Sequence, residues 1–287
     1  MTTEAIEKAP RTATWSGHTT PLLTLGRREA LRMLRSPAYL LVVGMVVLNG
    51  GVAVLFTDGP RGLPSAAVAY EGLLYFLALY GGLLTYIAVH LVASSSRRTH
   101  ADRQLAASAM SPRARLGGLC LGVVLGPFAV ALGVVAVMAW LGRFVAGTDE
   151  SSFLSEDAFM PWSLVELSQP MLTVAGAGLF AIMVATWLRF PGSLPIGFLA
   201  LLFGTLFVLD QGGSMPWFAP YITAPDWADD PRALAGSQTW HAVYLVGLCA
   251  LAVCGAMLRE RDGRRRWLAI SAGVFAATAL VGWLQLS

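Results

Sequence analysis

Seven long apolar runs constrain the fold of this chain more than any other feature of its sequence. An α-helix rises about 1.5 Å per residue, so roughly 20 apolar residues are needed to cross the hydrocarbon layer of a bilayer, which is about 30 Å thick. Most of the runs reach that length, and the fifth is the shortest. They predict an all-α polytopic membrane protein with spans at about 38–56, 71–93, 117–141, 164–188, 195–210, 241–258 and 267–286.

The composition agrees with that class of protein. Hydrophobic residues make up 56% of the 287 positions and charged residues 13%, about half of the roughly 25% found in soluble domains. No apolar core of a signal peptide precedes Pro37, so the first run should act as an uncleaved anchor. We therefore expect a flexible cytoplasmic tail at 1–20, an amphipathic helix at 21–36 and one transmembrane domain at 37–287.

The basic residues predict the orientation of the chain, because cytoplasmic loops of membrane proteins carry an excess of Lys and Arg. With the N-terminus inside, the four inside segments hold six, five, one and five basic residues. The outside segments hold only Arg61, Arg143 and Arg232. This division supports both the number of spans and their direction, and it predicts a C-terminus outside the cytoplasm.

The segment at 21–36, just before the first run, reads as an amphipathic helix. Such a helix lies along the membrane surface with its arginines toward the lipid phosphates. A plain basic flank that only follows the positive-inside rule is the alternative. On a helical wheel the apolar side carries Leu23, Ala30, Leu31 and Leu34, and the opposite side carries Arg28, Arg32 and Arg35.

A strongly basic segment at 94–116 separates the second and third runs. It contains five arginines and one acidic residue, Asp102. Thr99 is a suitable N-cap with Asp102 three residues later, and the pair Ser111 and Pro112 should stop the helix. A basic helical loop on the cytoplasmic side offers a surface that a cytoplasmic protein can bind.

Residue patterns needed for catalysis or ion coupling are missing from the sequence. No run carries Asp, Glu, Lys or Arg near its middle, which argues against a proton-coupled carrier but leaves a Na⁺ site made of carbonyls open. The single lysine, Lys8, lies outside any GxxxxGK[ST] motif, and HExxH and GxSxG do not occur. The three cysteines lack the CxxC spacing of a metal or redox site. We expect neither enzymatic activity nor a cofactor or metal in this chain.

A few residues inside the runs predict contacts between helices. Gln169 and Asn49 should hydrogen-bond between helices, with substrate contact as the alternative, whereas His241 at a run boundary should be solvated or interfacial. Pro127 and Pro170 should kink the third and fourth runs. Three stripes of small residues should allow close packing. The stripes are Gly118, Gly122 and Gly126; Thr173, Ala177 and Ala181; and Ala269, Gly273 and Ala277.

The order of these segments resembles the membrane subunits of ABC-2 type (type V) ABC transporters. RREALRMLRSP leads into the first run, LAASAMSPRAR precedes the third, and a loop rich in Pro and Trp at 211–240 precedes the sixth. The resemblance covers about 22–262 and rests on arrangement more than on identity. It implies a six-helix ABC-2-like bundle with an N-terminal elbow helix, to which the run at 267–286 adds a seventh, C-terminal transmembrane helix.

The resemblance also implies a function and partners. Residues 22–36 would be the elbow helix, 97–112 a coupling helix that docks on a nucleotide-binding subunit, and 211–240 an extracellular lid. The chain would be the permease of an exporter of hydrophobic or amphiphilic compounds in a bacterial inner membrane. It would form a homodimer or heterodimer, bind no nucleic acid, and leave ATP and Mg²⁺ to the partner ATPase. The coupling helix would use Arg97, Arg98, Asp102 and Arg103 for polar contacts and Leu105 and Met110 as apolar anchors.

Two other classes of function stay open. The chain could be a non-transporting membrane anchor or sensor that recruits a cytoplasmic partner through 94–116. It could also be a membrane-embedded enzyme acting on lipids, which the lack of paired polar groups disfavours. Co-purification of a chain that hydrolyses ATP separates an exporter from an anchor.

Overall fold

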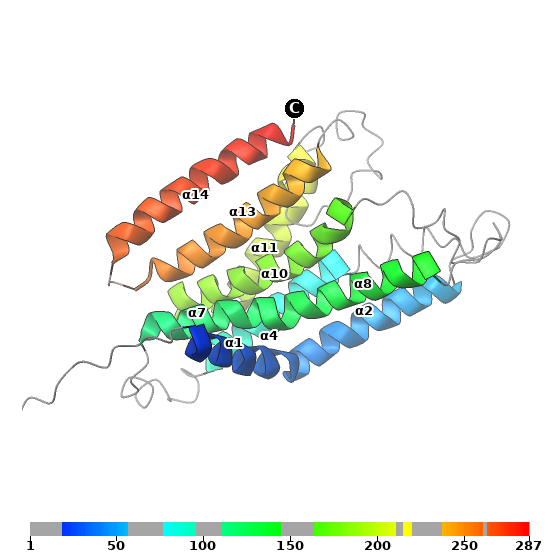
Figure 1. The fold of residues 1–287 in the computed structure, drawn as a ribbon, viewed down its shortest axis with the longest axis horizontal. Helices are drawn as coiled ribbons and strands as arrows, with labels where there is room; N and C mark the ends of the chain where they lie inside the picture. The colour runs from blue at the N-terminus through cyan, green and yellow to red at the C-terminus, as the bar shows by residue number, and fades with distance from the viewer. Residues whose placement is uncertain are drawn as a thin grey trace, which may run out of the picture.

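The computed structural model describes residues 19–56, 77–95, 111–144, 164–210, 215–219, 237–260 and 263–286. Within these residues every regular element is a helix, and each of the seven predicted apolar runs contains one (Figure 1). In chain order the elements are α1 (Thr19–Leu34), α2 (Pro37–Phe56), the π-helical turn η1 (Leu77–Gly81), α4 (Gly82–Ala93), α7 (Pro112–Val123), the π-helical turn η2 (Val124–Phe128), α8 (Ala129–Phe144), α10 (Leu164–Trp187), α11 (Ser193–Asp210), the 3-10 helix η3 (Met215–Phe218), α13 (Gln238–Met257) and α14 (Arg264–Leu284).

Four helical stretches in the described part of the chain are long and apolar enough to cross a membrane. They are Pro112–Ala136, Ser168–Trp187, Gln238–Met257 and Arg264–Leu284. Two further apolar helices, Gly82–Ala93 and Ser193–Val208, are shorter than that. The prediction of an all-helical fold is confirmed for the described residues, and these four helices are compatible with the predicted membrane protein.

The helix of the third apolar run begins at 112, five residues before its predicted start. The pair predicted to stop a helix in the basic loop marks the start of α7. The hydroxyl of Ser111 accepts a hydrogen bond from the backbone N–H of Ala114 at 3.2 Å, and Pro112 occupies the first helical position. Ser is a favoured N-cap and Pro is favoured at the next position, where its missing N–H is not needed. Arg113 and Arg115 therefore lie on α7.

The two prolines inside the apolar runs have different surroundings. Pro127 lies in the π-helical turn η2, where α7 passes into α8. A π turn is one way to accommodate the hydrogen bond that proline cannot donate. Helix α10, by contrast, continues from Leu164 to Trp187 through Pro170.

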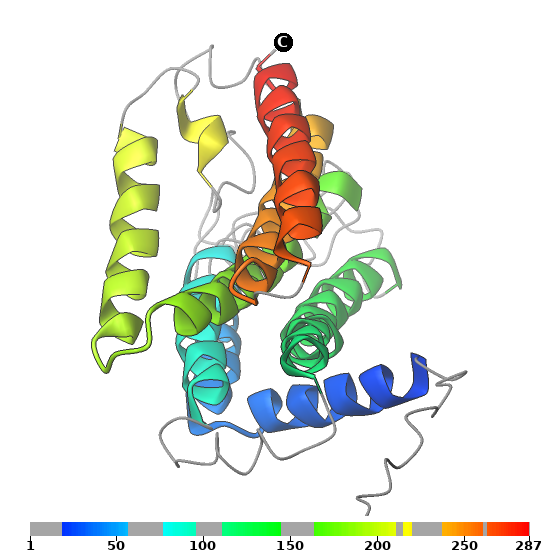
Figure 2. The same cartoon turned by 90° about the vertical axis from the view of Figure 1, so that its left-hand side faces the viewer.

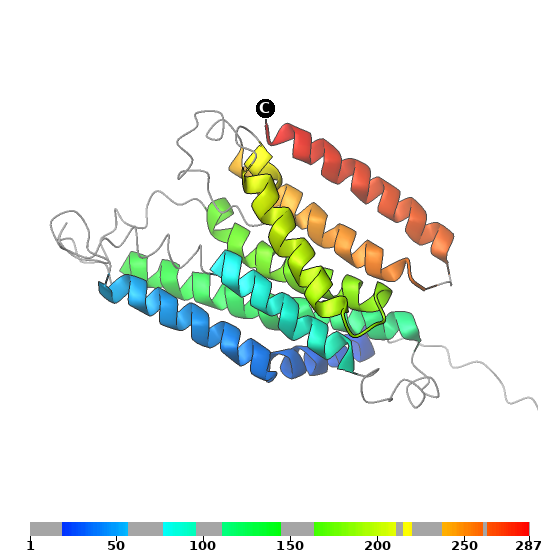
Figure 3. The same ribbon diagram turned by 180° about the vertical axis from the view of Figure 1, so that it is seen from behind.

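Helix α10 is the centre of the bundle. It packs against α4 on one side and α13 on another, and α14 covers the outer side of α13 (Figure 1). Helix α1 lies along one edge of the bundle, beside α4 and α7 (Figure 2). Helix α11 lies on the far side of the bundle in Figure 1, and in the reverse view it lies in front of α10 and α13 (Figure 3).

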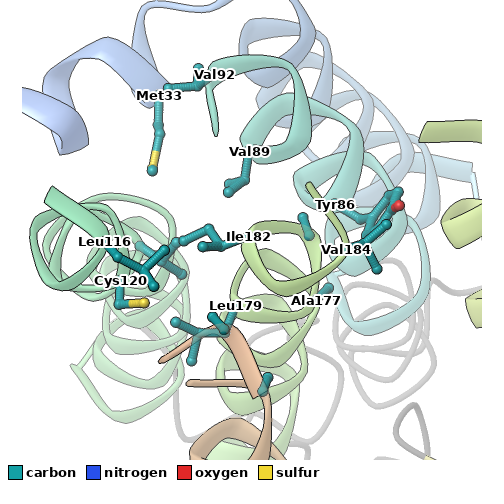
Figure 4. Packing of buried hydrophobic residues seen from close by; sticks show 14 of the residues in the cluster. Met33, Tyr86, Val89, Val92, Leu116, Cys120, Ala177, Leu179, Ile182 and Val184 are labelled. Carbon is teal, nitrogen blue, oxygen red and sulfur yellow. The ribbon is translucent and has the colours of Figure 1, made fainter. Parts of the chain in front are cut away.

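The main core forms where α4, α7, α10 and α13 meet, and Figure 4 shows Ile182 of α10 near its centre. Tyr86 and Val89 of α4 are fully buried in it. The predicted small-residue stripe on α10 is buried, because Thr173, Ala177 and Ala181 are all buried residues. Lipid tails are as apolar as a protein core, so close packing of such small residues is what favours helix association in a bilayer.

Helix α14 packs on α13 through a face that the sequence did not predict. The stripe of Ala269, Gly273 and Ala277 is exposed, so the prediction that it mediates packing is wrong for the contacts inside this chain. Thr278 packs instead against the bare backbone of Gly247 on α13. The missing side chain of Gly247 provides the space, and Thr278 is the residue of α14 that fills it.

A buried polar cluster ties α14 to α13 at the C-terminal end of α14. Gln285, just after α14, accepts hydrogen bonds at its backbone carbonyl from the N–H of Ser237 at 2.9 Å and at its side-chain oxygen from Nδ1 of His241 at 3.1 Å. The indole ring of Trp217 in η3 meets the His241 ring edge-on. His241 is therefore fully buried, and the prediction that it is solvated or interfacial is wrong.

Gln169 extends the same region into α10. Its side-chain amide donates to the side-chain oxygen of Gln238 on α13. The prediction that Gln169 hydrogen-bonds between helices is confirmed. Asn49 lies in α2, but its side chain is outside the described residues.

Candidate functional site

The region where the basic segment leaves and re-enters the bundle is the candidate functional site. The residues predicted to contact a partner lie outside the described residues, which end at 95 and resume at 111. They are Arg97, Arg98, Asp102, Arg103, Leu105 and Met110. What the structure describes is the set of helices that hold the two ends of this segment, which we call the segment anchors: α4 before it and α7 after it.

Helix α1 is bonded to the end of α4. The guanidinium of Arg32 donates to the hydroxyl of Ser95, the last described residue before the gap. The same guanidinium forms an ion pair with Glu29 on its own helix at 3.3 Å. Glu29 therefore holds Arg32 in position to reach α4, because residues three apart share a helix face.

Helix α1 packs in very close contact with α7, the other segment anchor. A Cβ placed on Gly122 would lie 3.2 Å from the backbone nitrogen of Ala30, and one on Gly126 would lie 3.3 Å from the Cα of Ala30. Backbone atoms cannot move aside as a flexible side chain can, so glycine is required for this approach. The predicted stripe on the third run is thus occupied by α1.

The buried face of α1 differs from the face predicted on the helical wheel. Gly26, Ala30 and Met33 are buried, and Met33 enters the main core between α4 and α7 (Figure 4). Leu23 and Leu31, which the wheel grouped with Ala30, are 52% and 43% exposed. The glycine stripe decides this face, since its bare backbone lies against Leu25, Glu29 and Ala30 of α1.

The predicted membrane-surface residues of α1 lie outside that contact. The exposed residues are Leu31 and the three arginines, Arg28, Arg32 and Arg35. Leu34 is half-buried against a second core cluster, which contains Tyr39 of α2. Exposed arginines beside exposed leucines are compatible with a helix that lies along a membrane surface. The face of α1 that packs on the bundle is separate from both of these exposed sides.

A buried polar contact joins α4 to the turn between α10 and α11. Nε2 of His90 and the hydroxyl of Ser193 share a hydrogen bond of 3.2 Å, and both side chains are buried. One turn earlier, the hydroxyl of Tyr86 donates to the backbone carbonyl of Leu194 at 3.3 Å. Because Ser193 is the first residue of α11, a displacement of the end of α4 acts directly on α11.

The turn between α13 and α14 touches the start of α7. Gly263 adopts a left-handed conformation with φ of 56°, which glycine tolerates without strain. A Cβ added there would lie 3.3 Å from Nη1 of Arg113. Elements far apart in sequence therefore gather around both segment anchors.

Sequence reasoning missed the partners of His90 and His241. A histidine inside an apolar run signals a buried polar contact, but nothing local identifies Ser193 or Gln285 as the other half. Among the described residues no three His, Cys, Asp or Glu side chains are grouped so that they could hold a metal ion. Cys120 and Cys254 are buried, and Cys249 is partly buried, none of them in a disulfide.

The chain was compared with protein-family models, curated proteins and solved structures, and none of these matches it.

Proposed function

We propose that this chain is the permease subunit of an ABC exporter, moved by a separate ATPase chain that binds the basic segment through residues 97–112. All seven apolar helices would cross a bacterial inner membrane, with the N-terminus in the cytoplasm and the C-terminus outside. Two permease chains, identical or related, would face each other and export a hydrophobic or amphiphilic compound. The seventeen inside and three outside basic residues support this orientation.

One observation carries the proposal: both anchors of this segment contact α1, and one of them, α4, is also hydrogen-bonded to α11. Arg32 bonds to Ser95 on the α4 side, and the glycine stripe holds α1 on the α7 side. His90 bonds to Ser193 at the start of α11. A protein that pulls on the segment would therefore move several helices together.

The mechanism follows from these connections. Closure of the ATPase chains would displace the segment, and α4 and α7 would follow because they are covalently continuous with it. Met33 of α1 would move with them, since it is buried between them. Ser193 would carry the displacement to α11. Only a difference in binding free energy between the two states can drive such a shift, so the ATPase must bind one arrangement of the segment more tightly.

A triple substitution in the segment tests the proposal. Arg98→Gln, Asp102→Asn and Leu105→Ala together remove two polar contacts and one apolar anchor from the expected interface. Because a few interface residues carry most of the binding energy, we expect recovery of a co-purifying ATPase chain to fall about tenfold or more. Export in proteoliposomes should fall in parallel, while insertion into the membrane stays normal.

A matched triple substitution in the outer loop serves as the control. Arg232→Gln, Asp229→Asn and Leu234→Ala change the same three residue types in a segment expected on the other side of the membrane. This control should leave ATPase recovery unchanged. Unchanged recovery of the ATPase with the segment variant would show that residues 97–112 are not the coupling helix. Recovery of a partner that neither hydrolyses ATP nor supports solute movement would favour the anchor or sensor instead.

A further inference from the structure

An apolar cavity lies between α10, α11 and α13, where the ring of Phe180 packs on Tyr86 of α4. Its volume is about 260 Å³. The lining includes Phe180, Met183 and the bare backbone of Gly176 on α10, Leu201 on α11, and Leu248 and Leu251 on α13. It is larger than an engineered apolar cavity of about 150 Å³ that stays dry and binds benzene.

The lining of this cavity selects against polar ligands. All but one of its side chains expose only carbon or sulfur, and the exception is Thr173, whose hydroxyl donates to the backbone carbonyl of Gln169 at 2.9 Å. A charged or strongly polar group placed here would lose its hydration without a compensating hydrogen bond, at a cost of several kcal/mol. The cavity therefore suits hydrocarbon.

The surroundings of the cavity narrow the choice of occupant. The helices that line it expose further apolar side chains, including Phe203 on α11 and Val246 on α13. Because α13 is long and apolar enough to cross a membrane, Val246 would face lipid tails. An aliphatic chain is thinner than a helix, whose diameter with side chains is about 10–12 Å, so it suits a recess lined by three helices of one chain.

We propose that this cavity binds a single linear aliphatic chain. The chain belongs either to a resident bilayer lipid or to an amphiphilic compound that the protein exports, and only the second source rests on the proposed function. Helix α11, which lies in front of α10 and α13 in Figure 3, contributes Leu201 to the lining that a bound chain would touch. Since Ser193 at the start of α11 is bonded to α4, the occupant contacts a helix that is linked to a segment anchor.

Filling the cavity tests the proposal. A Cβ on Gly176 would meet only the sulfur of Cys249, at an ordinary 3.4 Å, so Gly176→Leu can extend into the cavity without striking backbone. Leu201→Phe fills it from α11. In the control, Gly204→Leu, no described atom lies within 4 Å of the new Cβ. The melting temperature of each purified variant shows which of them fold.

The probe is a palmitate analogue with a photoactivatable diazirine at the end of its chain, applied to the purified full chain without a partner. Mass spectrometry should locate the adducts on peptides that contain Phe180, Met183 or Leu251. Labelling should fall about tenfold in Gly176→Leu and Leu201→Phe and stay unchanged in Gly204→Leu, which corresponds to a loss of about 1.4 kcal/mol. Labelling that is spread over all lipid-facing peptides, or that persists in folded Gly176→Leu, would overturn the proposal.

Two further measurements separate the sources of the chain. Native mass spectrometry of protein from its own membrane should find a retained lipid if the occupant is resident, and Gly176→Leu should then keep export. If the occupant is the exported compound, Gly176→Leu should lose export while keeping its ATPase partner. Photolabelling needs no partner, so its failure leaves the proposed function intact, and a failed ATPase co-purification leaves the cavity assignment intact.

Discussion

Nδ1 of His241 donates a hydrogen bond to the side-chain oxygen of Gln285 across 3.1 Å, and both side chains are fully buried. The two residues lie 44 positions apart, at the N-terminal part of α13 and just beyond the end of α14. Together with Thr278 against Gly247, this contact fixes which face of α14 is turned toward the bundle. Helix α14 is otherwise mostly exposed, so these contacts specify its position.

Removing that contact should destabilise the bundle. Gln285→Leu leaves Nδ1 of His241 without its acceptor, and interhelical hydrogen bonds in membrane proteins contribute about 0.5–2 kcal/mol. We expect a lower melting temperature in detergent and faster proteolysis near the C-terminus. Ser271→Ala is the matched control on α14, since that hydroxyl donates to the carbonyl of Trp267 in its own helix. Equal melting temperatures for the two variants would show that the contact is not stabilising.

A larger residue at Gly122 should push α1 away from α7. In Gly122→Val the new side chain would collide with the backbone of α1 at Ala30, and overpacking of this kind costs about 1–3 kcal/mol. Disulfide crosslinking between cysteines introduced at positions 26 and 121 should report the loss of contact, because Gly26 lies against Leu121. Gly133→Val is the control, as no described atom lies within 4 Å of a Cβ there. Efficient crosslinking in Gly122→Val would contradict the requirement for glycine.

The contact between His90 and Ser193 should couple the ATPase to transport. Ser193→Ala removes the hydrogen bond from α11 to His90 of α4 but keeps the one from Tyr86 to Leu194, and it leaves the partner-binding segment unchanged. We expect normal recovery of the ATPase and a fall in export per ATP hydrolysed of about fivefold or more, the range of a typical coupling free energy.

The control for this coupling is Thr186→Val on α10. The Thr186 hydroxyl donates to the carbonyl of Ile182 within the same helix, so its removal breaks no contact between helices. Both variants need comparable melting temperatures for the comparison. If Ser193→Ala exports as efficiently as the control, the proposal that movement is transmitted through α11 is wrong.

The predicted orientation can be measured by thiol labelling. In a chain whose native cysteines, Cys120, Cys249 and Cys254, are replaced by alanine, Arg103→Cys should react with a membrane-impermeant maleimide only after the cells are opened. Ala228→Cys in the outer loop should react in intact cells. Labelling of position 103 from outside would reverse the orientation and remove the cytoplasmic docking site.

Local features of the sequence were enough to predict where helices form. The lengths of the apolar runs placed a helix in each of seven ranges, and the Ser111 and Pro112 pair marked a helix boundary, although α7 begins there. The interhelical contact of Gln169 was also predictable, because a lone amide in an apolar helix needs a partner. Such signals depend only on neighbours in the chain.

The faces that these helices turn toward one another were decided by the tertiary structure. The helical wheel grouped Ala30 with Leu31, yet Ala30 is buried against α7 and Leu31 is exposed. The spacing of small residues predicted that α14 packs through Gly273, but Thr278 makes the contact with α13. In a membrane helix the side facing lipid and the side facing protein are equally apolar, so hydropathy does not distinguish them. Shape and buried hydrogen bonds do, and both require residues that are distant in the chain to meet.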